Sequence, residues 1–254
     1  MTLPASLRDR LRASGIHLLL SGAVAALCAL LVFCTWYPYP YREISGGREL
    51  FLIVVVVDII LGPLITFTVF NRAKPFKELR RDLTIVVLLQ IGALAYGLWT
   101  VSAARPVHMV FEFDRFRVVH AIDVPEEMLH QTPSGVDALP WTGPTLLAVR
   151  QFRDANEGME ATLAALRGAT LAARPDLWEP YAKATPRVLR AAQPVALLKS
   201  RFPESAAGID QLVAAAGGNP QTAVYLPLVG RKSVWTVLMD PAANVLGAMP
   251  LDSF

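Results

Sequence analysis

The sequence predicts a membrane protein in which three transmembrane α-helices are followed by one extracytoplasmic α+β domain with an antiparallel sheet. Of its 254 residues, 54% are apolar and only 18% are charged, whereas an ordinary soluble domain carries about 25% charged residues. The apolar excess lies in residues 1–104, which hold 10 Lys or Arg and 6 Asp or Glu. Residues 105–254 hold 14 Lys or Arg and 15 Asp or Glu, which is the composition of a globular domain. We therefore predict two regions, 1–104 and 105–254.

The predicted spans are residues 15–36, 50–70 and 83–104, each long enough to cross a bilayer core of about 30 Å at about 1.5 Å per residue. The first and third contain no charged residue, and the second contains only Asp58. A cleavable signal peptide is the alternative for the first span, but its apolar region is about 7–15 residues long. Because this span is longer and ends in the aromatic residues Trp36 and Tyr37, we expect a retained helix.

The distribution of positive charge predicts the orientation. Eight Lys or Arg residues lie before residue 13 or between residues 71 and 82, whereas the loop between the first two spans has only Arg42 and Arg48. This asymmetry places the N-terminus and the 71–82 loop in the cytoplasm. After three crossings, residues 105–254 emerge on the far side, which is the periplasm for a bacterial inner membrane. The net positive charge of the chain thus indicates membrane orientation, and we expect no nucleic-acid partner.

The exported region begins with strand patterns. Its 150 residues can bury a core without a metal or a disulfide, and both cysteines, Cys28 and Cys34, lie in the first span. Alternating apolar residues predict a hairpin of 107–113 with 116–122. The spacing of Asp123 and Glu126 is that of a capping box and predicts a short helix from Asp123. Pro and Gly residues predict a loop over 133–144.

A strand over 145–150 and a helix follow. The helix is opened by a second capping-box pair, Asp154 with Glu157, and carries Met159, Leu163 and Leu166 on one face.

The remaining elements are short helices over 177–201, a helix over 205–216 and three strands over 222–228, 233–239 and 244–249. Because Pro227 has no N–H, it predicts an edge or bulged position for the first of these strands.

Common catalytic signatures do not occur in the sequence, which has no phosphate-cradling glycine loop, G-x-S-x-G, H-E-x-x-H or C-x-x-C motif. The four histidines show no metal-ligand spacing: His17, His108, His120 and His130. His108 and His120 can face each other across the predicted hairpin, either as a solvated or core-edge pair or as metal ligands. We expect no enzymatic activity, no metal and no cofactor.

Polar residues in the spans are the strongest site candidates. A carboxylate at a helix centre costs about 2.5–3.5 kcal/mol on insertion scales, so Asp58 should face other helices or a partner. Tyr96 lies at a similar depth in the third span. If Asp58 has a purely structural role, we expect it to accept a hydrogen bond from the Tyr96 hydroxyl. Pro63, after Gly62, cannot donate to the carbonyl of Ile59, so we expect a kink in the second span.

Three runs carry a family resemblance: Trp36-Tyr37-Pro38, Gly46-Gly47-Arg48-Glu49-Leu50 and the ten residues 57–66, Val-Asp-Ile-Ile-Leu-Gly-Pro-Leu-Ile-Thr. They resemble the N-terminal half of the type IV pilin accessory proteins of the TfpX/TfpZ type. Later matches follow in order, at Arg81-Asp82-Leu83, Gln90, Ala95-Tyr96-Gly97, Arg105-Pro106-Val107 and Tyr225-Leu226-Pro227-Leu228. The resemblance is dense over 36–123 and loose over 130–220.

The resemblance implies an inner-membrane chaperone that holds a cognate type IV pilin subunit, the major pilin, before assembly. Its implied partners are that pilin, the lipid bilayer and other pilus-assembly proteins. The candidate partner-contact or polar-site residues are Asp58, Tyr96, Gly62, Pro63, Arg48, Glu49, Trp36 and Tyr37.

Two alternatives from other classes stay open. The first is a sensor or transporter subunit with Asp58 in a proton or ligand pathway, although transporters usually show paired discontinuous helices. The second is a membrane-bound enzyme that uses the exported domain.

Overall fold

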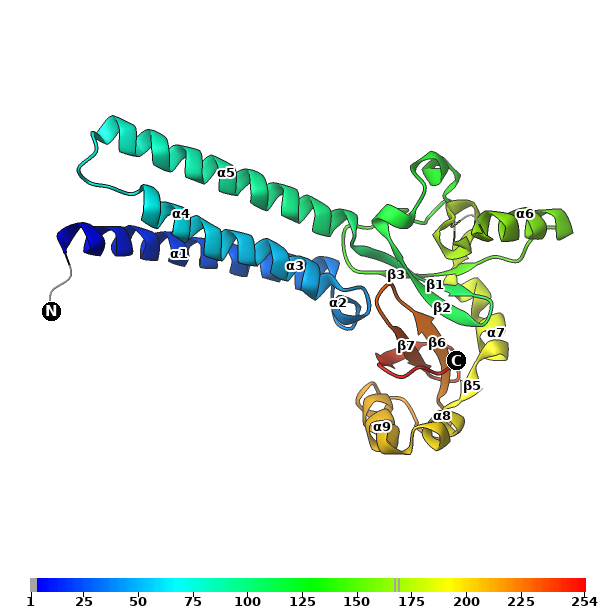
Figure 1. Ribbon diagram of the computed structural model, residues 1–254. Coiled ribbons are helices and arrows are strands. Elements are labelled where there is room, and N and C mark those ends of the chain that lie inside the picture. The colour runs from blue at the N-terminus through cyan, green and yellow to red at the C-terminus, as the bar shows by residue number, and fades with distance from the viewer. Residues whose placement is uncertain (1–3, 167, 169) are drawn as a thin grey trace. The chain divides into compact units, whose positions relative to one another are not determined.

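The computed structural model describes residues 4–166, 168 and 170–254 (Figure 1). The chain forms two compact units, which we describe separately. The membrane unit comprises the chain up to Pro38 together with Gly47–Ala103, and the C-terminal unit comprises Tyr39–Gly46 together with Ala104–Phe254. The segment Tyr39–Gly46, which lies within the predicted region 1–104, packs with the C-terminal unit.

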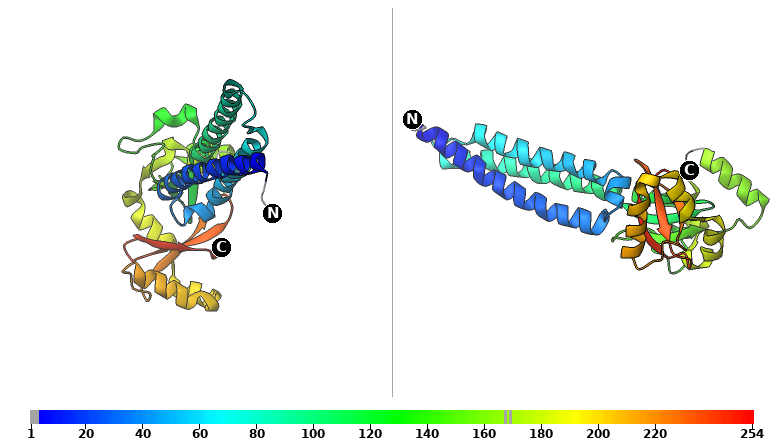
Figure 2. Two further views of the ribbon diagram at one scale, coloured as in Figure 1. Left: turned by 90° about the vertical axis from the view of Figure 1, so that its left-hand side faces the viewer. Right: turned by 90° about the horizontal axis from the view of Figure 1, so that it is seen from below.

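Three long apolar helical segments form the membrane unit and run alongside one another in both figures (Figures 1 and 2). The first is α1 (Ala5–Leu31) continued by a π-helical turn, Val32–Trp36. The second is α3 (Gly47–Val56), a π-helical turn (Val57–Leu61) and α4 (Gly62–Val69), and the third is α5 (Phe76–Ala103). These segments confirm the three predicted apolar helices, and the first and third begin earlier than predicted, at Ala5 and Phe76.

An eight-stranded sheet forms the centre of the C-terminal unit. Its order is β4-β3-β1-β2-β6-β7-β8, with β5 also paired to β6. The strands are β1 (Pro106–Glu112), β2 (Arg115–His120), β3 (Thr145–Val149), β4 (Trp178–Pro180), β5 (Gln193–Pro194), β6 (Val224–Val229), β7 (Val234–Met239) and β8 (Val245–Met249). The predicted hairpin and the three final strands are present, which confirms the α+β class. The sheet is mixed, because β1–β3 and β2–β6 are parallel pairs.

Helices cover both faces of this sheet. They are α2 (Tyr41–Ile44), α6 (Ala155–Leu166), α7 (Tyr181–Ala191), α8 (Val195–Arg201) and α9 (Ala206–Ala215), with short 3₁₀ turns between them. On one face, Ile44 and Val188 pack with Phe111 and Phe116. On the other face, Ala161 of α6 packs with Val110. Since β1 is covered on both faces, all seven of its residues are buried.

Three local expectations differ from the structure. A register shift between Pro106 and His108 changes the alternation predicted for β1. The cap after the hairpin is His120, which exchanges hydrogen bonds with Asp123, so Asp123 ends a 3₁₀ turn and does not open a helix. Pro227 lies in β6, which is an interior strand, but the pairing with β2 covers only Leu228 and Val229. The missing N–H of Pro227 therefore falls outside the parallel ladder.

Candidate functional site

The polar centre of the membrane unit lies where the second span changes from π to α geometry. In a π-helix each carbonyl accepts from the residue five positions later, which for Asp58 is Pro63, and Pro63 has no N–H. The carbonyl oxygen of Asp58 instead accepts a hydrogen bond from Gln90 Nε2 at 3.3 Å. A Cβ at position 62 would overlap that amide nitrogen, so Gly62 is required for Gln90 to reach the backbone. At the position of the predicted kink, the second span forms a π turn, and the Gln90 side chain of α5 bonds the carbonyl of Asp58 there.

Residues of α1 complete this centre. Ser14 Oγ donates a hydrogen bond to the carbonyl of Pro63 at 2.8 Å, and His17 Nδ1 lies 2.5 Å from Thr66 Oγ1. His17 and Asp58 both line a cavity of about 480 Å³ between α1, the second span and α5. The Asp58 side chain is only 8% exposed. In the part of the chain that the structure describes, its carboxylate has no hydrogen bond or ion pair.

Tyr96 does not belong to this centre. Its side chain is 69% exposed, and its ring lies 5.9 Å from that of Trp99. The neighbouring Gly97 is the residue that faces the second span, because a Cβ there would lie 2.7 Å from Val54 Cγ2. Successive helical residues are rotated by about 100°, so Tyr96 points away from Asp58. The predicted hydrogen bond between Tyr96 and Asp58 is therefore wrong.

The aromatic candidates form a second cluster in the membrane unit. Trp36 and Tyr37 are buried with Phe51 and Val101, and the Tyr37 hydroxyl donates to the carbonyl of Val101 at 3.1 Å. Gly47 leaves room for the Tyr37 ring, which a Cβ would overlap.

Arg48 and Glu49 follow Gly47 in the first turn of α3, where both are exposed. A carboxylate in this position suits the positive end of the helix dipole.

The loop between the first two spans is built into the C-terminal unit. Ile44 is fully buried in the sheet's core, and its carbonyl accepts a hydrogen bond from the backbone N–H of Lys232 at 3.0 Å. A Cβ on Gly230 would overlap Ile44 Cγ2. The ring of Tyr39 packs edge-on against Trp235, with centroids 6.3 Å apart. The loop and the domain therefore form one folding unit.

The two hairpin histidines have separate partners. Burial lowers the pKa of His108 to about 4, and its neutral ring bonds Thr145 Oγ1 at 2.7 Å and the carbonyl of Ala138 at 3.0 Å. His120 Nδ1 bonds Asp123, which also accepts from Arg231 at 2.7 Å. Although burial opposes it, these contacts lower the pKa of the Asp123 carboxyl. Within the described residues, no cluster of three or more metal-ligating side chains occurs.

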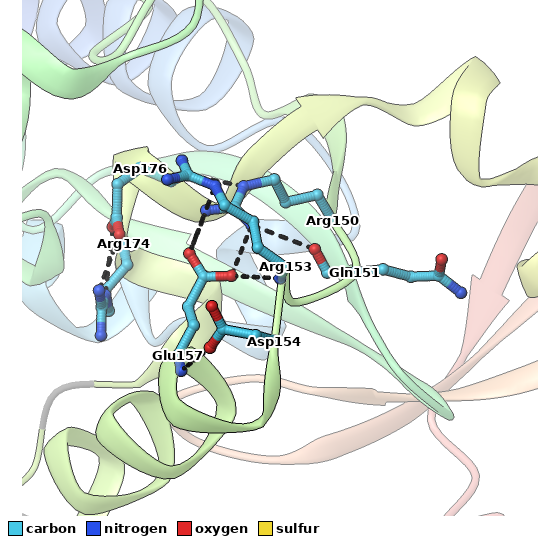
Figure 3. Close-up of polar contacts among 7 residues, drawn as sticks. All are labelled: Arg150, Gln151, Arg153, Asp154, Glu157, Arg174 and Asp176. Carbon is cyan, nitrogen blue, oxygen red and sulfur yellow. Dashed lines mark hydrogen bonds and ion pairs between the residues drawn. The ribbon is translucent and has the colours of Figure 1, made fainter.

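Helix α6 is held at its N-terminus by an ion-pair network (Figure 3). Arg150 makes two bonds to the Glu157 carboxylate, at 2.7 and 2.9 Å, and Asp154 accepts from the N–H of Glu157 at 2.8 Å. Arg150 lowers the pKa of Glu157 to about 2. Asp154 caps the helix as predicted, but the Glu157 carboxylate accepts from the N–H of Arg153 rather than from that of Asp154, so the capping box is only half formed. The apolar face of the helix, Met159, Leu163 and Leu166, is exposed.

Two functional candidates were missed from the sequence. The sequence does not single out His17 among its four scattered histidines, and it indicates Gln90 only through the family resemblance. The available signal was helical spacing, because Ser14, His17 and Ser21 lie three and four residues apart and thus share one face of the first span.

Comparisons with known proteins identify related sequences. The sequence family described as "Fimbrial assembly protein FimB" matches residues 5–46. Over 95% of both chains, the protein is 37% identical to "Fimbrial assembly protein, serogroup I" and 35% identical to "Fimbrial assembly protein, serogroup E1", both from Dichelobacter nodosus. A third relative, "Fimbrial assembly protein, serogroups C1 and C2", is 43% identical over 44% of this chain and 85% of its own length.

No solved structure matches the chain. The match to two relatives over nearly their whole length shows that the chain belongs to the family of fimbrial assembly proteins.

Proposed function

We propose that this protein is an inner-membrane chaperone that holds a type IV pilin, the major fimbrial subunit, before pilus assembly. It acts by binding, without a catalytic step or cofactor. The observation that carries the proposal is the cavity between α1 and α5, in which Asp58 is 8% exposed and its carboxylate has no bonded partner within the described residues. Membership of the fimbrial assembly family supplies the class of partner.

The proposal assigns different tasks to the two units. A fimbrial subunit with an apolar anchor and a globular part needs a partner surface in the bilayer and another outside it. Association of helices in lipid depends on close packing and polar contacts, because lipid chains are as apolar as the helices. The membrane unit offers both kinds of contact. The C-terminal unit offers a folded surface that includes the exposed apolar face of α6.

The proposed orientation has the N-terminus and residues 71–82 in the cytoplasm and the C-terminal unit in the periplasm. Support comes from the eight-to-two charge asymmetry and from the packing of Tyr39–Gly46 with the C-terminal unit. Two spans separate this loop from the domain, so both lie on the same side of the membrane. A periplasm-active reporter fused at the C-terminus should be active and one fused at Lys77 silent. Activity at Lys77 would overturn the orientation.

Deletion of the gene tests the function itself. The steady-state level of the major fimbrial subunit in the membrane should fall, while minor subunits and unrelated membrane proteins keep their levels. Complementation with the wild-type gene should restore it. Unchanged subunit levels in the deletion strain would contradict the chaperone role.

A further inference from the structure

The cavity between α1, the second span and α5, which we call the groove, combines an apolar lining with one carboxylate. Its volume is about 480 Å³, and most of its lining comes from apolar residues of α1 and α5, among them Ile16, Leu20, Val87 and Ile91. Leu20 and Ile91 are more than half exposed. The groove therefore opens toward the space that lipid or another membrane protein fills.

Asp58 gives this groove a chemical requirement. Its backbone carbonyl is already bonded by Gln90 Nε2, so the second span is fixed around it. The carboxylate itself lines the groove and has no hydrogen bond or ion pair to any residue that the structure describes. His17, on the opposite helix, is held by Thr66 Oγ1 at 2.5 Å. A carboxylate at this depth is costly until a donor meets it.

The bilayer restricts what can fill such a groove. Within the hydrocarbon, an occupant is either a lipid chain or a helix, because any other backbone leaves its polar groups unbonded. A lipid chain would match the apolar lining but would leave the carboxylate of Asp58 without a donor. A helix that carries a hydroxyl, amide or amine side chain satisfies both the lining and the carboxylate.

We propose that the groove between α1 and α5 is the docking site for the transmembrane helix of the fimbrial subunit, and that Asp58 accepts a hydrogen bond from a donor side chain of that helix. This assignment rests on the proposed function, which it deepens by naming the contact surface. The Asp58 carboxylate is thus a partner-binding group, whereas Gln90, Gly62 and Pro63 are positioning residues that fix the backbone beside it.

Site-specific photo-crosslinking in the native membrane tests the docking site. A photoreactive amino acid is placed at Leu20 or Ile91, which line the groove, and at Leu18 or Leu89 as matched controls on the same helices. Neither control residue lines the groove, and each lies about 200° from its partner position. Adducts with the fimbrial subunit should form at Leu20 and Ile91 and stay at background at Leu18 and Leu89. Equal adducts at all four positions, or adducts only with lipid or a second copy of this chain, would overturn the proposal.

A second measurement isolates the carboxylate. In a chain with the photoreactive group at Ile91, Asp58→Leu should lower the adduct yield about 3-fold to 18-fold, the range for one hydrogen bond between membrane helices. Asp58→Asn keeps an acceptor oxygen and should lower it less. The abundance of this chain should not change in either variant. Equal yields in all three chains would show that Asp58 is not a contact.

The outcomes separate the groove from the function. If the subunit level depends on this chain but adducts do not form preferentially in the groove, the docking site is wrong and the chaperone role stands. If the subunit level does not depend on this chain, the proposed function is wrong.

Discussion

The carbonyl oxygen of Ile44 accepts a hydrogen bond from the backbone N–H of Lys232 at 3.0 Å. Ile44 belongs to the loop between the first two spans, whereas Lys232 lies in the turn between β6 and β7. The side chain of Ile44 is fully buried in the core of the C-terminal unit. The loop Tyr39–Gly46 is therefore fixed in the C-terminal unit by this hydrogen bond and by the buried Ile44 side chain, a contact that we call the clip.

Substitution at Gly230 tests this clip. In Gly230→Ala, the new Cβ would overlap Ile44 Cγ2 and lie 2.8 Å from the Ile44 carbonyl oxygen. We expect the free energy of unfolding of the C-terminal unit to fall by about 1–3 kcal/mol, as for an overpacked core. Denaturant unfolding of the purified chain in detergent measures it. Gly208→Ala is the matched control, because its Cβ meets only the end of Met249 at 3.5 Å, and it should be neutral or slightly stabilising. Equal stability of both variants would argue against the clip.

A second glycine pair tests the polar centre. Gly62→Ala places a Cβ on the Gln90 amide and should displace it from the carbonyl of Asp58, with a cost of about 1–3 kcal/mol. Gly92→Ala, in α5, meets nothing within 4 Å and serves as the control. The melting temperature in detergent and the abundance of the chain in membranes should both fall for Gly62→Ala and stay unchanged for Gly92→Ala. Wild-type behaviour of that variant would show that the Gln90 contact does not stabilise the π turn.

Two tyrosines at the membrane unit give opposite expectations. Tyr37→Phe removes a buried hydroxyl that donates to the carbonyl of Val101, so stability should fall by about 0.5–1.5 kcal/mol. Tyr96→Phe removes a hydroxyl from a side chain that is 69% exposed and should leave both stability and the fimbrial subunit level unchanged. Melting temperatures of the two variants make the comparison. A larger loss for Tyr96→Phe would restore the role that the sequence suggested for this residue.

Mild acid should lower the free energy of unfolding of the C-terminal unit, because His108 is buried in its neutral form. Burial lowers the pKa of this imidazole from 6.5 to about 4, so the unfolded chain binds the proton first as the pH falls. Stability contributed by the neutral ring is complete above pH 6.5 and is lost as the pH falls toward 4. At about pH 5 the loss is about 2 kcal/mol relative to neutral pH.

Unfolding at neutral pH and at about pH 5 measures the effect, and His108→Gln should remove most of the difference between the two conditions. The interval lies above the range in which Asp123 and Glu157, whose pKa values are lowered, take up protons. An unchanged pH dependence in the variant would assign the effect to another group.

The sequence predicted the spans well because length and hydropathy determine which segments can cross a bilayer. It also located the irregular point at Gly62-Pro63, since Pro63 lacks a donor. It did not predict that Gln90 would bond Asp58, because that contact depends on the rotation of α5 against the second span. The same rotation explains the error at Tyr96, since equal depth does not determine which face a residue occupies.

In the C-terminal unit, local patterns predicted strands but not their neighbours. The parallel pairs β1–β3 and β2–β6 join segments separated by loops and helices, and no local periodicity encodes such pairing. The role of Ile44 in the sheet's core was missed for the same reason, because its loop is short and lies far from β6 and β7 in the sequence.

The lifetime of the fimbrial subunit in the membrane, measured in cells that cannot assemble pili, tests the central claim most directly. A pulse-chase in such cells, with and without this protein, separates holding of the subunit from assembly itself. The account predicts that the subunit is degraded faster when the protein is absent, and that wild-type protein restores its lifetime whereas Asp58→Leu restores it only in part. Identical subunit lifetimes with and without the protein would contradict the account.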